Sequence, residues 1–185
     1  MGDTRKRLIG PDRLPPMIGK YFGGKRRLGP KYPSPEHGEI VEPFAGGAGY
    51  SLCHWRHDVT LYEKSEHVCA VWDFLIGAEP RDILALPVVE PGERVSEMGL
   101  PLGAETLIRG WLAAWEGAGA ADKRTGWSLQ SWPDVPTEYW GAKCRQRIAD
   151  HVGCIKHWRC VRVDDYSEIP DREATWFIDP PYQGM

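Results

Sequence analysis

The sequence has no long run of apolar residues, and this absence narrows its class. None of its 185 residues fall in a stretch of about 18 uncharged apolar residues, which a membrane helix would need. The N-terminus is basic, but no apolar segment follows it, so it does not have the form of a secretory signal. Apolar residues make up 42% and charged residues 26%, the proportions of an ordinary folded domain. We therefore expect about one domain and no membrane partner.

Cysteine is also scarce. The five cysteines are an odd number, and no two of them form a C-x-x-C pair. This pattern argues against a disulfide framework and against a zinc site, and it favours reduced thiols in a cytoplasmic protein. We therefore expect no bound metal.

The charge is unevenly distributed along the chain. The formal net charge is −3, which by itself gives no hint of nucleic acid. Residues 1–35 hold nine Lys and Arg against two acids, so this part is +7 and the other 150 residues carry −10. A basic arm on an acidic body could contact phosphate groups, and a solvated tail is an equally good interpretation.

The hydrophobic pattern predicts strands alternating with helices. After a helix expected over 50–57, Ser65 is a good N-cap for a helix over 66–76, which Gly77 would end. A loop over 87–103 and helices over 106–116 and 138–152 follow. Strands are expected at 39–44, 59–63, 159–164 and 175–179. This order predicts an α/β fold whose parallel sheet is interrupted by a mainly helical insertion. The expected divisions are a flexible leader (1–16), a core (17–86 and 159–185) and the insertion (87–158).

A glycine-rich turn follows the first predicted strand, in the segment EPFAGGAG at 42–49. Glycines at this point let the backbone approach a ligand closely. Glu63 lies 19 residues past Phe44, at the end of the second strand, where an acid can accept hydrogen bonds from both ribose hydroxyls. The segment departs from G-x-G-x-x-G and the chain lacks G-K-[ST], which argues against a plain NAD site and a P-loop. An adenosine-containing cofactor is favoured over a simple surface turn.

The last predicted strand ends in Asp179-Pro180-Pro181-Tyr182. The carboxyl edge of a parallel sheet is where α/β proteins hold their ligands. The Asp179 side chain and the Pro180 carbonyl would give two acceptors for one amino group, and Tyr182 a stacking face for a base. A rigid strand end capped by an aspartate is the plainer alternative.

Five segments in order now resemble one family: YFGGKRR (21–27), EPFAGG (42–47), LYEK (61–64), VDDY (163–166) and DPPY (179–182). Together they are similar to the Dam-like DNA adenine-N6 methyltransferases, which use S-adenosylmethionine. The resemblance covers about residues 17–182 and implies a partial Rossmann-like sheet of about four strands, in the order third, second, first, fourth. Ala48 stands where many members have a third glycine, and Glu63 where Asp is more usual.

The resemblance implies roles for individual residues. Tyr21 and Lys25 would hold the methionine end of the cofactor, and Phe44 and Gly46 its floor. Glu63 would bind the ribose. Asp165 would accept from the adenine amino group of the cofactor and Tyr166 would pack on its ring, with Asp164 an equal candidate for the acid. The catalytic set would be Asp179, Pro180, Pro181 and Tyr182.

The resemblance also implies a partner and a reaction. Double-stranded DNA would be the substrate, with a flipped-out adenine methylated at N6 by direct displacement. Trp127, Trp132, Lys123 and Arg124 lie in the insertion, where the family reads its target, although core packing suits the tryptophans as well. An RNA base amino-methyltransferase and an inactive cofactor-binding remnant are the alternatives. The family's strands beyond DPPY are absent, so we expect a fragment that self-associates along the strand at 175–179.

Overall fold

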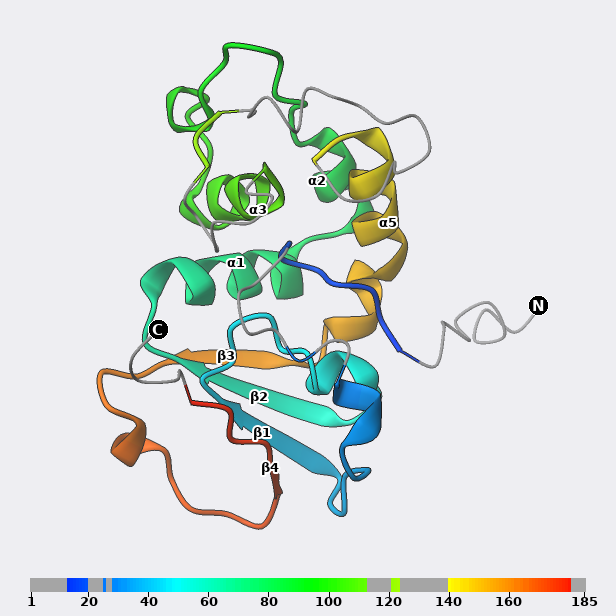
Figure 1. The fold of residues 1–185 in the computed structure, drawn as a ribbon, viewed down its shortest axis with the longest axis vertical. Helices are drawn as coiled ribbons and strands as arrows, with labels where there is room; N and C mark the ends of the chain where they lie inside the picture. The colour runs from blue at the N-terminus through cyan, green and yellow to red at the C-terminus, as the bar shows by residue number, and fades with distance from the viewer. Residues whose placement is uncertain (1–12, 20–24, 26–27, 113–120, 124–139, 181–185) are drawn as a thin grey trace, which may run out of the picture.

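The protein is an α/β structure built on a four-stranded parallel sheet (Figure 1). The computed structural model describes residues 13–19, 25, 28–112, 121–123 and 140–180. The strands are β1 (Glu39–Pro43), β2 (Asp58–Glu63), β3 (Arg159–Arg162) and β4 (Thr175–Trp176). Their order in the sheet is β3-β2-β1-β4, and every neighbouring pair is parallel. The predicted α/β class and parallel sheet are confirmed, and this arrangement is compatible with a Rossmann-like fold.

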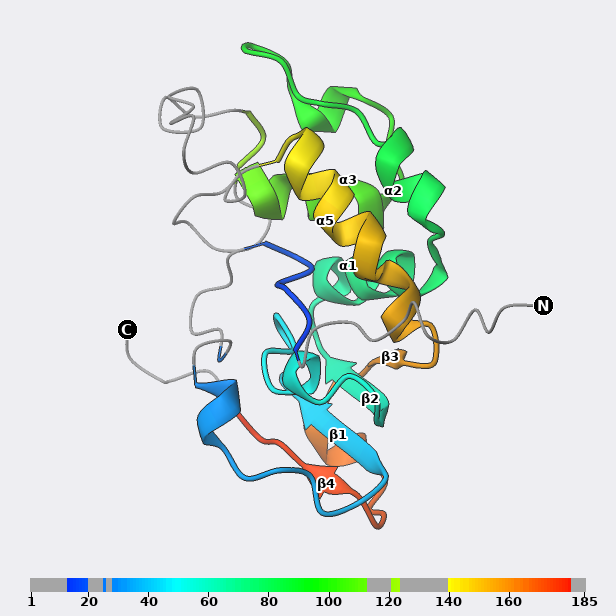
Figure 2. The ribbon, with the colours of Figure 1, turned by 90° about the vertical axis from the view of Figure 1, so that its right-hand side faces the viewer.

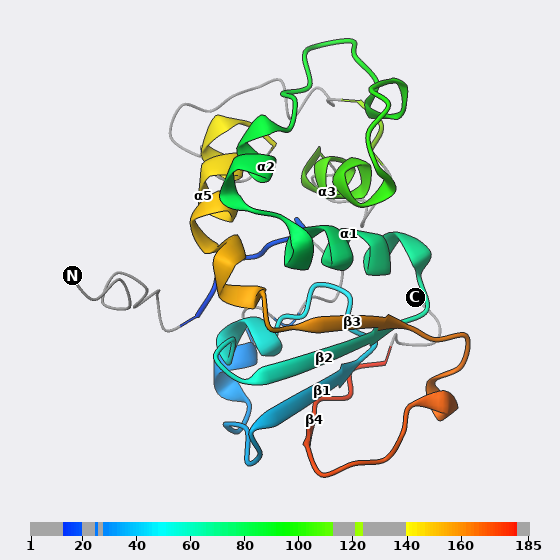
Figure 3. The same cartoon turned by 180° about the vertical axis from the view of Figure 1, so that it is seen from behind.

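The two faces of the sheet are covered differently. Because side chains alternate along a strand, Ile40 and Val41 of β1 belong to two separate hydrophobic clusters. Ile40 packs in the large core shared with the helices. Val41 packs with Tyr62, Val163 and Ala174, so the segment after β3 covers the opposite face. Figure 3 shows this segment leaving β3 and looping round to reach β4.

The helices gather beyond β3, at the end of the molecule away from β4 (Figures 1 and 2). They are α1 (Glu66–Gly77), α2 (Pro80–Ala85), α3 (Leu102–Leu112) and α5 (Ala142–Val152). The predicted α1 is confirmed together with its cap, since the Ser65 hydroxyl accepts from the Val68 N–H. Single 3₁₀ turns lie at Gly29–Lys31, Ser51–Cys53, Val95–Glu97, Gly153–Ile155 and Tyr166–Glu168.

The insertion differs from the prediction in its boundaries. Helix α3 begins four residues earlier than expected, at Leu102 instead of Thr106, and residues 113–120 lie outside the described part. Helix α5 begins at Ala142 and buries Cys144, Ile148 and Val152, the predicted apolar stripe. Helix α2 was not predicted; it starts at a proline, and the Asp82 carboxylate accepts from the Glu79 N–H at its first turn.

The predicted helix over 50–57 is wrong, because only the 3₁₀ turn Ser51–Cys53 forms there. The Ser51 N–H is bound to the side chain of Glu42 rather than to a helix carbonyl. His54 then leaves the helical region and ends the turn.

The flexible leader predicted over residues 1–16 extends too far, because its last residues belong to the folded core. Leu14, Met17 and Ile18 are buried in the main core, and the Leu14 N–H donates to the Leu52 carbonyl. Gly19 has φ +92° and touches α3 so closely that a Cβ on it would lie 2.4 Å from the Gly110 oxygen. The segment from Leu14 to Gly19 is therefore anchored in the main core and against α3.

Strand β4 is shorter than the predicted 175–179, although the Phe177 N–H still donates to the Val41 carbonyl. Ile178 beyond it is exposed. The predicted strand order, third-second-first-fourth, is confirmed. Within the described ranges, no helix is both long and apolar enough to span a membrane.

Candidate functional site

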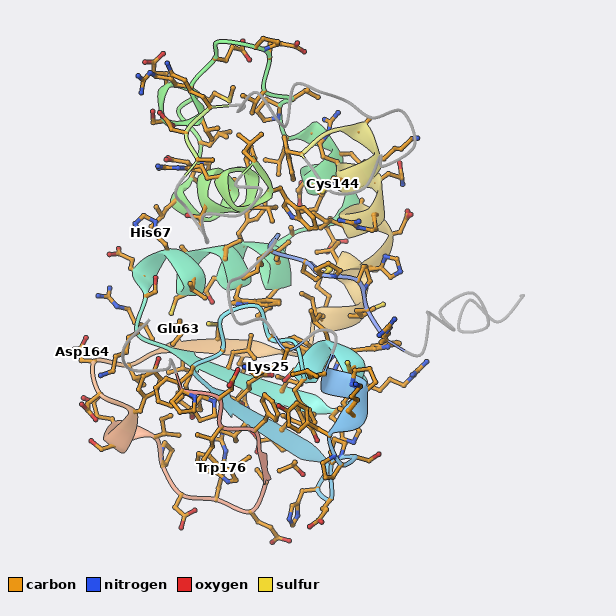
Figure 4. All side chains as sticks on the ribbon, viewed as in Figure 1. Lys25, Glu63, His67, Cys144, Asp164 and Trp176 are labelled. Atoms are coloured by element: carbon orange, nitrogen blue, oxygen red, sulfur yellow. The ribbon has the colours of Figure 1, made fainter. Side chains whose placement is uncertain are left out.

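Residues from four parts of the chain meet at the carboxyl edge of the sheet. In a parallel sheet the carboxyl ends of neighbouring strands lie together, which is where α/β proteins bind ligands. Phe44 follows β1, Glu63 ends β2 and Asp179 follows β4. Lys25 joins them from the N-terminal segment, and Figure 4 shows Lys25 and Glu63 beside the sheet, with Cys144 away in the helical layer.

Lys25 and Asp179 form an ion pair, with 2.7 Å between the ammonium nitrogen and a carboxylate oxygen. Their side chains are only 11% and 26% exposed, so the pair is largely shielded from water. The two residues come from opposite ends of the sequence. The family resemblance assigns Lys25 to the cofactor and Asp179 to the target base, rather than to each other. Pro180 is exposed beside them. Tyr21, Pro181 and Tyr182 lie outside the described residues.

Glu63 is a buried carboxylate held by backbone donors. It is 7% exposed, and its Oε2 accepts from the Gly46 N–H at 3.1 Å. Oε1 accepts from the N–H groups of Lys64 and Ser65 at 2.9 and 3.1 Å, with the Tyr166 hydroxyl at 3.4 Å. A carboxylate offers about four acceptor positions. Among the described donors, only the Gly46 N–H donates to Oε2. This oxygen can therefore accept a further hydrogen bond from a hydroxyl group.

The glycine-rich turn is fixed from both sides. Gly46 has φ +44°, its N–H is bound by Glu63 and its carbonyl accepts from the Trp72 indole at 2.9 Å. Phe44 and Ala48 also have left-handed backbones, with φ of 56° and 47°. Non-glycine residues seldom adopt this conformation, and it is often found at ligand sites. Ala48 stands where many members of the similar family have glycine. Its small side chain is buried in this left-handed conformation.

An aromatic pair lies next to Glu63. The rings of Phe44 and Tyr166 have centroids 3.8 Å apart, tilted by 37°. Asp165 does not join them: it is exposed, accepts from the Ser167 N–H and lies 3.6 Å from the Lys64 ammonium. The Ser167 hydrogen bonds and the Lys64 charge lower the pKa of Asp165. Asp164 is exposed as well. Of the predicted pair, Tyr166 reaches the other site residues and Asp165 faces solvent.

The sequence prediction missed Glu42, which belongs to the same edge. Glu42 is 4% exposed, and both the N–H and the hydroxyl of Ser51 donate to its Oε2. Burial raises the pKa of Glu42 to about 7, against the hydrogen bonds from Ser51, and the charge of Asp179 raises it further. The signal was an acid between apolar residues near the end of the strand segment EIVEPF, whose other acid, Glu39, is its first residue.

This pKa predicts how stability depends on pH. The carboxyl binds its proton more tightly in the folded state, so its contribution is complete below about pH 4.5 and lost as the pH rises through about 7. The loss is on the order of 3 kcal/mol. In Glu42→Gln this part of the pH dependence is expected to vanish. Urea unfolding at pH 5 and pH 8 measures it, with Glu97→Gln, an exposed acid, as the control. An equal pH dependence in wild type and Glu42→Gln would contradict the assignment.

A second aromatic group supports the strand end before Asp179. Phe177 stacks on Tyr50, with centroids 4.4 Å apart and rings 4° from parallel, and Tyr32 meets Phe177 edge-on at 5.0 Å. The Tyr50 hydroxyl donates to the Pro33 carbonyl. These contacts fasten the segment after Lys25 to the end of β4.

No disulfide joins any of the five cysteines. The Cys69 thiol donates to the Glu63 backbone carbonyl, and burial raises the pKa of Cys144 to about 12 and also raises that of Cys160. Such thiols are poor nucleophiles. In the described ranges no group of three or more His, Cys, Asp and Glu side chains could hold a metal ion. Lys123 is exposed, and Trp127, Trp132 and Arg124 lie outside the described residues.

Comparison with models of known protein families and with curated proteins finds no match to this chain. The function of the protein is therefore inferred from the site residues and their geometry.

Proposed function

We propose that the chain transfers a methyl group from S-adenosylmethionine to the N6 amino group of adenine in double-stranded DNA. The observation that carries this proposal is the Lys25–Asp179 ion pair. It joins a cation suited to a cofactor carboxylate and an acceptor suited to a base amino group, at the edge where Glu63 ends β2.

The residues at this edge fit the proposed cofactor in kind. Glu63 is a shielded carboxylate with acceptor capacity on Oε2, which suits a ribose hydroxyl. Phe44 and Tyr166 offer aromatic faces next to it, and Lys25 offers an ammonium group on the other side of the turn. A ligand with a ribose, a ring and a carboxylate matches this set.

The chemistry requires positioning more than covalent help. When bound, S-adenosylmethionine supplies a methyl group on a positively charged sulfur, which becomes a neutral thioether after transfer. Asp179 and the Pro180 carbonyl would accept hydrogen bonds from the two N6 hydrogens and so localise the nitrogen lone pair. One N6 proton then leaves to solvent. The target base must first leave the duplex.

Replacing Lys25 tests the cofactor's carboxylate site. Lys25→Gln is expected to raise the dissociation constant for S-adenosylmethionine about tenfold, because a charge-assisted hydrogen bond is worth about 1–3 kcal/mol. Calorimetry measures this, and Lys31→Gln, an exposed lysine nearby, should bind as the wild type does. Equal affinity in both variants would remove Lys25 from the site.

The function itself is tested by following a labelled methyl group. The protein is incubated with S-adenosyl[methyl-³H]methionine and duplex DNA or RNA, and the nucleosides are then separated. Label on N6-methyladenine from DNA is the expected result. Label found only in RNA would favour the RNA enzyme, and label on cytosine N4 would contradict the substrate. Cofactor binding without transfer would favour the inactive remnant, and no binding by the folded chain would overturn the proposal.

A further inference from the structure

The Lys25–Asp179 ion pair joins two groups that the proposed function needs for different ligands. The Lys25 ammonium lies 2.7 Å from a carboxylate oxygen of Asp179, and the pair is largely shielded from water. The proposed reaction uses Lys25 for the carboxylate of the cofactor and Asp179 for the amino group of the target base. While the ion pair is closed, each of these charges is already satisfied by the other.

The pair can open by a movement of side chains alone, because the backbone on both sides is held. The Leu28 N–H donates to the Lys25 carbonyl at 2.9 Å. Gly29 packs so closely on the glycine-rich turn that a Cβ on it would lie 3.0 Å from the Gly49 oxygen. On the β4 side, Phe177 is held by its stacked aromatic neighbour. The lysine side chain, in contrast, has a flexible four-carbon stem that can carry the ammonium to another acceptor.

One ammonium cannot serve two carboxylates equally well in this shielded place. A cofactor carboxylate that binds Lys25 beside Asp179 brings two negative charges to a single positive charge. Like charges at short range disfavour each other, and shielding from water strengthens this effect. A further acid, Glu63, is buried at the same edge of the sheet. The cofactor carboxylate and Asp179 therefore compete for Lys25.

We propose that the Lys25–Asp179 pair is an autoinhibitory contact that the cofactor opens. The inference rests on the proposed function, which supplies the two ligands. The carboxylate of S-adenosylmethionine takes Lys25, and Asp179 loses the charge that stabilised it. A shielded carboxylate that has lost its partner needs a new donor, and an N6 hydrogen of the target adenine supplies one. The site thus takes the base after the cofactor, and it holds the base weakly when no cofactor is bound.

This competition predicts that the two ligands strengthen each other's binding, by about tenfold in each direction. The effect requires a carboxylate on the cofactor and an amino group on the base. S-adenosylhomocysteine has the carboxylate and transfers no methyl group, whereas 5′-methylthioadenosine has the same ribose and adenine without the carboxylate. Oligodeoxyadenosine presents amino groups without base flipping, and oligodeoxythymidine has none.

The experiment measures how tightly labelled oligodeoxyadenosine binds the full chain, by fluorescence anisotropy. Saturating S-adenosylhomocysteine should lower its dissociation constant about tenfold, and 5′-methylthioadenosine should leave it unchanged. Neither ligand should change the binding of oligodeoxythymidine.

Calorimetry on Asp179→Asn tests the same competition from the cofactor's side. This variant removes the competing charge, so it should bind S-adenosylhomocysteine about tenfold more tightly than the wild type and 5′-methylthioadenosine equally well. Asp171→Asn, at an exposed position, should bind both ligands as the wild type does.

The outcomes separate the two proposals. If both small ligands bind the wild type, but Asp179→Asn binds S-adenosylhomocysteine no more tightly, the inference is wrong and the proposed function stands. Weaker binding in Asp179→Asn also contradicts it, because Asp179 would then hold the cofactor itself. If Asp179→Asn does not fold, equal oligodeoxyadenosine binding with and without S-adenosylhomocysteine in the wild type overturns the inference. If the folded wild type binds neither small ligand, the proposed function fails and the inference fails with it.

Discussion

Asp179→Ala is expected to lower the rate of methyl transfer to adenine by about 10²–10³, the usual effect of removing a group that acts on the reacting atoms. Asp179 is the side-chain acceptor proposed for the N6 hydrogens, and it lies at a shielded strand end in an ion pair with Lys25. Single-turnover transfer of labelled methyl to an adenine-containing duplex measures the rate directly.

The control for this variant is Asp171→Ala, an exposed aspartate in the segment between β3 and β4. It should methylate at the wild-type rate. Circular dichroism and cofactor calorimetry show whether Asp179→Ala still folds and binds, since Lys25 is released from its partner in this variant. Adenine methylation that persists near the wild-type rate would remove Asp179 from the catalytic set.

Glu63→Ala is expected to destabilise the fold by about 3 kcal/mol and to lose most cofactor affinity. The substitution leaves the N–H of Gly46 without its side-chain acceptor, and it frees the N–H groups of Lys64 and Ser65 before α1. Unsatisfied buried donors carry a desolvation cost of about 1–3 kcal/mol each. Urea unfolding should show a lower midpoint at an unchanged slope.

Two further variants separate folding from binding at this position. Glu168→Ala removes an exposed acid from the 3₁₀ turn after Tyr166 and should leave the unfolding midpoint where it is. Glu63→Gln keeps one oxygen for the turn but removes the charge, so it should recover stability more than cofactor affinity. A stable Glu63→Ala that binds the cofactor as the wild type does would contradict both roles.

Local signals account for the parts of the fold that were predicted correctly. The short runs EIVEP and DVTLYE, which contain β-branched residues, mark the two central strands, and Ser65 three residues before Val68 marks the start of α1. The short helix α2 was missed because Gly77 and Pro80 are residues typical of loops. The helix expected after Gly49 is limited to the turn Ser51–Cys53, because the backbone leaves the helical region at His54.

The sequence singled out several residues that lie at this edge of the sheet, but it could not show the contacts between them. Lys25, Glu63 and Asp179 were each recognised from short motifs. Their contacts depend on the order of the strands. Because β4 pairs with β1, Asp179 lies next to Lys25 of the N-terminal segment. The ring of Tyr166, which follows β3, packs against Phe44. The raised pKa of Glu42 has the same origin, since it requires both burial and the charge of Asp179.

The position of β4 also has a consequence for synthesis on the ribosome. Strands β1 and β2 are close in sequence and can pair early. One edge of β1 stays unpaired until Thr175 and Trp176 of β4 have been synthesised. Pairings across such a long stretch of chain form slowly. Until then Val41 lacks its neighbour on that side, and Lys25 has no carboxylate from Asp179. The growing chain must keep the flank of β1 from pairing wrongly while the whole helical layer is being made.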